Sequence, residues 1–510
     1  MAHSWNRARA DERITHRLEE VRNVTVLDFT RDMSLENIPV NRAYRIAAAH
    51  LYADILNLDE MLDATQTEGT DCHRRTLRFL NLHYRAVHRI LNECDARRVD
   101  FHNQRLHAIV YKPYGADSEK ERVDRAVAIA SLIMDVLKET GDSDDKIPAA
   151  RVRVGIDTGR ALVVNNGRSG NREPLFLGRP ANHAAHLAGH ADETGIFLSN
   201  AGRKAIGLAE LNDGKEYTAA LTSVEIDGCV ERAKLGVSKD KIVEDWRQDL
   251  KDNPIGTFEF CRHTPPLRTL DIEALTPKNS RRFEATSVYA DVDGFTAYVS
   301  KHLEGAPENV VRCFHVIRAE LDAALSSDFD GRRVRFIGDS LHGALLEGTA
   351  YETDAEDTIS TMTLCAGGLR SSFDLSLERL QKRGIDVANL GLQIGFEYGP
   401  LAISRLGMQG DRVRCCVARA VLASEDEQMR CQGKETALGP TAYGNGSAAV
   451  RKLFGATRKV ANLTYDVAVD ALSAEGDKVA KAAFDQQLAV SAPIILTRPE
   501  QILRPHCKSR

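Results

Sequence analysis

Two aspartates in the second half of the chain, Asp291 and Asp339, are the residues best suited to chemistry. Asp291 ends an apolar run and is followed by VDGFT, and Asp339 lies in RRVRFIGDSLHGAL, a pattern typical of a β-hairpin. Strand ends and hairpin turns can be neighbours in a sheet, so the two carboxylates could share one site. Paired hard oxygen ligands suit Mg²⁺ or Mn²⁺ bound together with the phosphates of a substrate. Two such ions can activate an attacking oxygen and neutralise a leaving one.

Each aspartate also has an ordinary structural interpretation. Gly-Asp is common in turns, and Asp291 could cap the helix that follows it. The order of the two motifs, in a strand-end and a hairpin context, favours the shared site.

The chain contains the pattern around these aspartates twice. ARRVDFHNQRLHAI, from Ala96, aligns without a gap with GRRVRFIGDSLHGA, from Gly331. Upstream, HLYADILNLDEML matches SVYADVDGFTAYV, and downstream, RVRVGIDTGRALVV matches GLQIGFEYGPLAIS. Three blocks in the same order indicate two copies of one domain.

The repeat predicts an α+β fold in which helices cover an antiparallel sheet. We expect an N-terminal, partly helical segment at 1–44, domain 1 at 45–250, a proline-containing linker at 251–282, domain 2 at 283–470 and a C-terminal segment at 471–510. In domain 2 we expect a strand at 287–292, a helix at 310–324, a hairpin at 333–337 and 341–346, a helix at 355–383 and a strand at 392–396.

Composition excludes several classes of protein. A formal charge of −5 gives no field that would attract nucleic acid or an anionic membrane. The N-terminus lacks the apolar core of a signal peptide, and no apolar stretch is long enough for a membrane span. The ten cysteines are scattered without zinc spacings, which indicates reduced thiols in a cytoplasmic protein.

The two motifs together resemble the class III adenylate and guanylate cyclases, whose catalytic domains carry an F-A-D-I-x-G-F-T strand end and a K-x-x-G-D hairpin. The resemblance covers most of both copies. It implies two tandem ferredoxin-like, βααβ-containing domains that form an intramolecular pseudo-heterodimer. In that family one domain supplies the metal aspartates, and the other supplies base-selecting residues, a ribose-orienting Asn and a transition-state Arg. The resemblance therefore implies two Mn²⁺ or Mg²⁺ ions at Asp291, Val292 and Asp339, and a phosphate-facing loop at Gly294, Phe295 and Thr296.

The first copy has lost the metal half of such a site. Asp54 matches the first metal position, but Gln104 stands at the second. The first copy keeps the substrate half, because its ANHAAH matches the family's V-N-x-A-x-R element. Asn182 fits the ribose-orienting Asn, and His186 replaces the Arg, where a protonated imidazole could stabilise phosphoryl charge.

The second copy shows the opposite loss. Its matching region reads VARAVLASEDEQ, so Leu422 or Ala418, depending on register, replaces the Asn. The asymmetry predicts one active site, with its metal half in domain 2 and its substrate half in domain 1.

The base-reading positions of that site are Asp100 and Leu175. Members of the family that use ATP carry Lys with Asp or Thr at these two positions, and members that use GTP carry Glu with Cys. This chain has neither pair. The departure is similar to the bacterial Pycsar cyclases, which make cyclic UMP or cyclic CMP as phage-defence signals. A carboxylate accepts from a ring N–H or an exocyclic amine, so Asp100 does not by itself choose the pyrimidine. We expect UTP, with CTP as the alternative.

Four arginines are candidates for binding the triphosphate. Arg412 and Arg414 lie where the resemblance implies a phosphate Arg, and a guanidinium fork suits that task; a solvated surface position is the alternative. Arg97 and Arg98 flank the base-pocket strand, and alternation does not say which of them faces the ligand.

The resemblance implies a nucleotidyl cyclase that forms a 3′,5′-cyclic nucleotide and pyrophosphate, with a separate effector that reads the product. Two alternatives stay open: a purine cyclase with an atypical base pocket, and a non-catalytic nucleotide-binding pseudocyclase. The protein could be a monomer, as a pseudo-dimer, or a homodimer.

Overall fold

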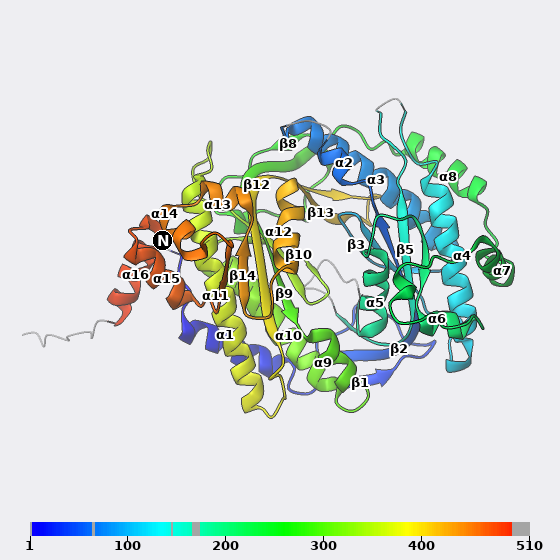
Figure 1. Cartoon of the computed structure of the whole chain (residues 1–510), viewed down its shortest axis with the longest axis horizontal. Coiled ribbons are helices and arrows are strands. Elements are labelled where there is room, and N and C mark those ends of the chain that lie inside the picture. The colour runs from blue at the N-terminus through cyan, green and yellow to red at the C-terminus, as the bar shows by residue number, and fades with distance from the viewer. Residues whose placement is uncertain (1–2, 64–66, 144–145, 166–173, 492–510) are drawn as a thin grey trace, which may run out of the picture.

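The protein forms two β-sheets that lie side by side, each covered by helices (Figure 1). The computed structural model describes residues 3–63, 67–143, 146–165 and 174–491. Domain 1 carries the first sheet and domain 2 the second, and the two domains share an extensive interface. The predicted α+β fold with tandem domains is therefore confirmed.

The two sheets have the same central strand order. The first contains β1 (Thr25–Asp28), β2 (Arg42–Ile55), β3 (Arg97–His102), β4 (Arg105–Val110), β5 (Val152–Asn165), β6 (Pro174–Leu177) and β7 (Gly195–Leu198). The second contains β8 (Phe260–Cys261), β9 (Ser280–Asp293), β10 (Arg332–Ile337), β11 (Ser340–Leu345), β12 (Gly391–Leu406), β13 (Val413–Val417), β14 (Glu435–Leu438) and β15 (Lys459–Ala461). The orders β3-β4-β2-β5 and β10-β11-β9-β12 are antiparallel throughout and correspond strand by strand.

Helices connect these strands and cover their faces. Domain 1 contains α2 (Asp59–Leu62), α3 (Thr70–Glu93), α4 (Glu119–Leu137), α5 (Arg179–Ala188), α6 (Asn200–Ala205), α7 (Ser223–Ala233) and α8 (Lys239–Asp252). Domain 2 and the C-terminal segment contain α9 (Phe295–His302), α10 (Pro307–Ala323), α11 (Ala355–Lys382), α12 (Arg419–Met429), α13 (Pro440–Asn445), α14 (Ala448–Phe454), α15 (Tyr465–Ala474) and α16 (Lys478–Ser491). A short π-helix at Ala324–Asp328 continues α10.

The register of the central strands confirms the repeat. Tyr52 of β2 lies opposite Gly155 of β5, and Tyr289 of β9 lies opposite Gly395 of β12. These are the residues that the sequence alignment pairs, so the two copies share their strand register as well as their order.

The central strand β9 is apolar along its middle because both of its faces are buried. Val288 and Ala290 belong to the core that also contains residues of α10 and α11. Tyr289, between them, points the other way and packs with Leu267 and Leu270 of the linker. Alternate residues of a strand face opposite sides, so one short segment serves two layers.

The segments outside the predicted domains are packed on them. The first helix, α1 (Arg7–Glu20), lies against α10 and α11 of domain 2, whereas β1 joins the sheet of domain 1. The linker is buried against the second sheet, and β8 pairs with β9. The boundary expected at 45 falls inside β2 and the one expected at 471 falls inside α15, because the regular structure continues across both. Within the described residues, no helix combines the length and apolarity that crossing a bilayer requires.

Candidate active site

The two domains meet where α5 of domain 1 faces α9 of domain 2. The side-chain amide of Asn182, on α5, donates a hydrogen bond to the hydroxyl of Thr296, at the start of α9. Thr296 belongs to the loop that follows Asp291. The structure therefore brings the predicted substrate half and the predicted metal half together across the domain interface.

Asp291 and Asp339 lie on neighbouring elements of the second sheet. Asp291 is near the end of β9, and Asp339 lies in the turn between β10 and β11, the strand that pairs with β9. Burial raises the pKa of Asp291 to about 6, with the charges of Asp293 and Glu425 adding to it. Burial and the charge of Asp291 raise the pKa of Asp339 well above its usual range. The two carboxylates are thus close enough to repel each other.

The matching aspartate of domain 1, Asp54, has cations beside it. Arg105 of β4 and Arg153 of β5 are its register partners on the two neighbouring strands. Arg105 Nε lies 3.8 Å from Asp54 Oδ2, and the same guanidinium forms an ion pair with Glu425 on α12 of domain 2. Fixed arginines therefore provide the positive charge in the degenerate site.

The predicted metal pair of domain 2 has a cation near it, the buried Arg318 of α10, whose charge partly offsets the effect of burial on the pKa of Asp339. At the position matching Arg153, Gln393 lies opposite Asp291 on β12. Two crowded carboxylates fit hard divalent ions such as Mg²⁺ or Mn²⁺. Val292, whose carbonyl is the third predicted ligand, directly follows Asp291 on β9.

The loop after Asp291 has a fixed conformation. Gly294 has a φ of +79°, and a Cβ there would lie 2.7 Å from the carbonyl oxygen of Asn389. Only glycine suits both requirements. Phe295 is buried, and its ring stacks on Phe314 of α10 with centroids 5.8 Å apart. The N-terminus of α9 is therefore held rigidly beside the metal pair.

The structure settles which residue replaces the Asn in domain 2. Gly155 packs on the backbone of Ala184, and its counterpart Gly395 packs on that of Ser424. Ala184 and Ser424 are therefore equivalent, so the residues two positions before them, Asn182 and Leu422, are equivalent as well. The second copy of the site thus has an apolar side chain at the ribose position.

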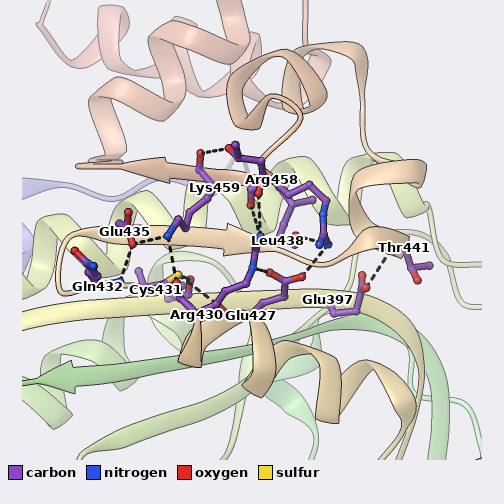
Figure 2. Close-up of polar contacts among 12 residues, drawn as sticks. Glu397, Glu427, Arg430, Cys431, Gln432, Glu435, Leu438, Thr441, Arg458 and Lys459 are labelled. Carbon is purple, nitrogen blue, oxygen red and sulfur yellow. Dashed lines mark hydrogen bonds and ion pairs between the residues drawn. The ribbon is translucent and has the colours of Figure 1, made fainter.

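The helix that carries Leu422, α12, is anchored to the edge of the second sheet. Figure 2 shows Glu427 of α12 forming ion pairs with Arg430 and with Arg458, whose Nη1 lies 2.8 Å from the carboxylate. In the same view Glu397 accepts a hydrogen bond from the backbone N–H of Thr441, at the start of α13. These contacts give α12 a structural role within domain 2.

His186 lies one turn after Asn182 on α5. Desolvation and the charges of His183 and Arg105 lower its pKa. The lowered pKa favours the neutral imidazole, which can donate a hydrogen bond. Stabilisation of phosphoryl charge by His186 stays a prediction.

The base-reading positions are buried, and one already has a partner. Asp100 forms an ion pair with Arg335 of domain 2, and its Oδ2 lies 3.3 Å from Nδ1 of His102. Leu175 is buried on β6 opposite Val164. Arg335 occupies the carboxylate of Asp100, so base recognition by Asp100 stays a prediction that requires the carboxylate to be shared.

The predicted phosphate arginines, Arg412 and Arg414, have surroundings of their own. Arg414 Nε donates to Glu273 at 2.6 Å, and its Nη1 donates to the carbonyl of Val334 at 3.0 Å. Arg412 lines a cavity together with Arg97 and Arg98. The β12–β13 hairpin, which carries Arg412, lies against α3 and β3 of domain 1. Substrate contacts by Arg412 and Arg414 stay a prediction.

Sequence reasoning missed the ion pair of Arg105 with Glu425. The signal was present in the repeat alignment, which sets Arg105 against Ser340 and Arg153 against Gln393. A comparison of charges at matched positions, in addition to the motif residues, could have found it.

Comparison with known proteins decides the family. A curated Pseudomonas aeruginosa protein named uridylate cyclase is 55% identical over 100% of this chain and 99% of its own length. A second protein of that name, from a Rhizobium species, is 42% identical over 82% of each chain. The chain belongs to the uridylate cyclase family of class III nucleotidyl cyclases.

A solved structure agrees with this assignment. The crystal structure of a class III adenylyl cyclase-like ATP-binding protein from Pseudomonas aeruginosa matches with a TM-score of 0.91 and 56% identity, covering 92% of this chain and 100% of that one. No protein-family model matches the chain. As a class III cyclase the protein is an enzyme that acts on a nucleotide, in a class that generally uses divalent metal ions.

Proposed function

We propose that the protein is a uridylate cyclase that converts UTP to 3′,5′-cyclic UMP and pyrophosphate. The name of both curated relatives supports the substrate. The hydrogen bond from Asn182 to Thr296 supports a single site between the domains, because it joins the ribose position of one to the metal half of the other.

In this proposal the side chains of the site position the substrate. Asp291, Asp339 and the carbonyl of Val292 would hold two Mg²⁺ or Mn²⁺ ions, which when bound acidify the ribose 3′-hydroxyl and neutralise charge on the triphosphate. Asn182 offers an amide donor and acceptor to the ribose. The loop at 294–296 presents the N-terminus of α9 to the phosphates.

The proposed reaction needs no amino-acid nucleophile. The 3′-oxygen attacks the α-phosphorus in line, its proton passes to solvent, and pyrophosphate leaves with the electrons of the broken P–O bond. Positioning and charge stabilisation provide most of the rate enhancement. His186 contributes a hydrogen bond to the phosphoryl oxygens.

The base pocket rests on fewer observations than the metal pair. Leu175 offers an apolar surface to the base, and Asp100 can accept from a uracil or cytosine donor only if it shares its carboxylate with Arg335. CTP is the second candidate substrate for this reason.

The test is incubation of the full-length protein with ATP, GTP, CTP or UTP and Mn²⁺, followed by mass detection of cyclic products. We expect cyclic UMP as the main product. Cyclic AMP or cyclic GMP as the main product would establish the purine cyclase instead. Absence of every cyclic product, in a protein that still binds nucleotide, would establish the pseudocyclase.

We also propose a biological setting. The product is a second messenger for a separate cyclic-nucleotide-binding effector in bacterial antiphage defence, in the cytoplasm. Nine free cysteines among the described residues agree with a reducing compartment. One chain supplies both halves of the site, so a monomer suffices. Phage challenge of cells carrying active or Asp339→Asn protein, with the effector present, tests the defence role; equal protection by both would contradict it.

A further inference from the structure

A cavity lies between the two domains, away from the metal pair. It is bordered by the end of α3 and the start of β3 in domain 1, and by the β12–β13 hairpin of domain 2. β3 and β13 are adjacent above the meeting point of α5 and α9 in Figure 1. Its lining includes four arginines: Arg97, Arg98, Arg405 and Arg412. We call it the arginine cavity. Asp291, Asp339 and Asn182 are not among the described residues that line it.

Most acidic groups around the cavity already have cationic partners. Asp411 receives two hydrogen bonds from Arg98, at 3.0 and 2.6 Å, and lies 2.9 Å from Nε2 of His88. Asp95 lies 2.8 Å from the ammonium of Lys112. These carboxylates are therefore neutralised within the protein.

Two of the four arginines, Arg97 and Arg412, have weak or no compensation from the described carboxylates. Arg405 is 3.4 Å from Glu273, whereas the nearest described carboxylate to Arg97 is that of Glu36, at 3.9 Å, and it is 69% exposed. The guanidinium of Arg412 forms no hydrogen bond or ion pair with any described residue, and its Nε is buried. Burial and the charge of Arg405 lower the pKa of Arg412. Partly buried guanidinium groups with few acidic partners favour the binding of an anion beside them.

We propose that the arginine cavity binds a polyphosphate anion, with Arg412 and Arg97 as its principal contacts. Guanidinium groups bind phosphate oxygens through paired, charge-assisted hydrogen bonds. The shared chemistry is a chain of phosphates, and its source is either free pyrophosphate or the triphosphate of a nucleotide. This inference goes beyond the proposed cyclase reaction, because the cavity is separate from the metal pair.

Binding here would act on the active site through the domain interface. Arg97 belongs to domain 1 and Arg412 to domain 2, so one anion that contacts both stabilises the arrangement in which Asn182 meets Thr296. An effector that favours this arrangement must, by linkage, bind more tightly when substrate holds the same arrangement.

The experiment uses full-length protein with Asp291→Asn and Asp339→Asn, in EDTA, so that metal-dependent binding at the active site is removed. Sodium pyrophosphate is titrated by calorimetry at constant ionic strength, and UTP in a parallel series. We expect one pyrophosphate per chain. Arg412→Gln removes one charge-assisted contact, so we expect it to lower the affinity for pyrophosphate about tenfold or more. Arg247→Gln, at an exposed arginine on α8, is the matched control and should bind as the parent does.

Several outcomes decide the inference. If Arg412→Gln lowers the affinities for pyrophosphate and for UTP equally, the cavity binds the phosphate chain that the two ligands share. If it lowers only the affinity for pyrophosphate, the ligand is free pyrophosphate. Undiminished binding in Arg412→Gln, or no binding by the parent at millimolar pyrophosphate, would overturn it. Arg97→Gln replaces Arg412→Gln if the latter does not fold by circular dichroism. Because the assay contains no metal and no turnover, its result is independent of whether UTP is the substrate.

Discussion

Asp100 of the first copy and Arg335 of the second occupy equivalent positions in the repeat and form an ion pair with each other across the domain interface. In a two-fold interface, residues close to the axis meet their own equivalents. Two identical copies would bring like charges together there. The divergence of this one position therefore favours the pairing of domain 1 with domain 2 over the pairing of either with itself.

A charge exchange tests this relationship. Asp100 and the guanidinium of Arg335 are both largely buried, so we expect Asp100→Arg or Arg335→Asp alone to lower the free energy of unfolding by about 3–5 kcal/mol. The double exchange should recover part of that loss, as measured by urea unfolding of all four proteins. Strictly additive losses would show that the two side chains do not interact energetically.

Removal of either metal aspartate should abolish turnover. Asp291→Asn and Asp339→Asn keep the shape of the side chain and remove the charge that holds the divalent ions, so we expect a loss of at least about 10³-fold in cyclic product. Circular dichroism should show an intact fold. Asp54→Asn is the matched control in the degenerate site and should retain near-normal activity. An inactive Asp54→Asn protein would contradict the single-site arrangement.

Asn182 should act mainly on kcat. Asn182→Ala removes the amide that positions the ribose and contacts Thr296, and we expect kcat to fall by about 10²-fold. Leu422→Ala changes the equivalent position in the other copy and should leave kcat within about twofold, since no substrate group is expected there. Similar losses of kcat in both proteins would argue for two working sites.

Asp54 should make stability depend on pH. Burial, opposed by Arg105 and reinforced by Glu425, raises its pKa from 3.8 to about 6 in the folded protein. The folded state then binds the proton more tightly, so this group lowers stability as pH rises from about 4 to 6. At pH 7 the ionised Asp54 therefore lowers the free energy of unfolding by about 3 kcal/mol. Asp54→Asn should remove this part of the pH profile in urea unfolding; an unchanged profile would show that Arg105 keeps the group ionised.

Arg13 should contribute strongly to stability. Its guanidinium contacts Glu320 and Asp328, whose side chains are 1% and 0% exposed. Arg13→Gln leaves these buried carboxylates undercompensated, and we expect a loss of about 3 kcal/mol or more in the free energy of unfolding. Arg7→Gln, on the same helix, removes an exposed pair with Glu378 and should cost less than about 1 kcal/mol. Equal effects of both substitutions would contradict the role given to burial.

The fold could be predicted from the sequence because the repeat shows the pattern of each central element twice. The strand predicted at 287–292 is part of β9, the hairpin is β10–β11, and the helix predicted at 355–383 is α11. Gly155 and Gly395, which the alignment pairs, occupy equivalent register positions on β5 and β12. The helix α9 was not predicted, because it begins within the loop that the motif reading assigned to phosphate binding.

The position of a candidate site residue could be predicted where the course of the backbone alone determines it. Asp291 and Asp339 depend on the end of one strand and the turn of a hairpin, which sequence patterns locate well. Arg412 and Arg414 depend on where a long hairpin lies against the other domain, and no local pattern contains that information. For the same reason, the partner of Asp100 could not be read from its own strand.

The position of α1 has a consequence for how the chain is made. This helix is translated before either domain, yet Arg13 pairs with Glu320, which lies 307 residues later in the chain. Its docking surface on α10 and α11 therefore does not exist until most of the chain has been translated. A product truncated within domain 1 has an N-terminal helix without its docking surface, and it lacks Asp291 and Asp339. Docking of α1 and closure of the interface around the candidate active site therefore both wait for domain 2 to be translated.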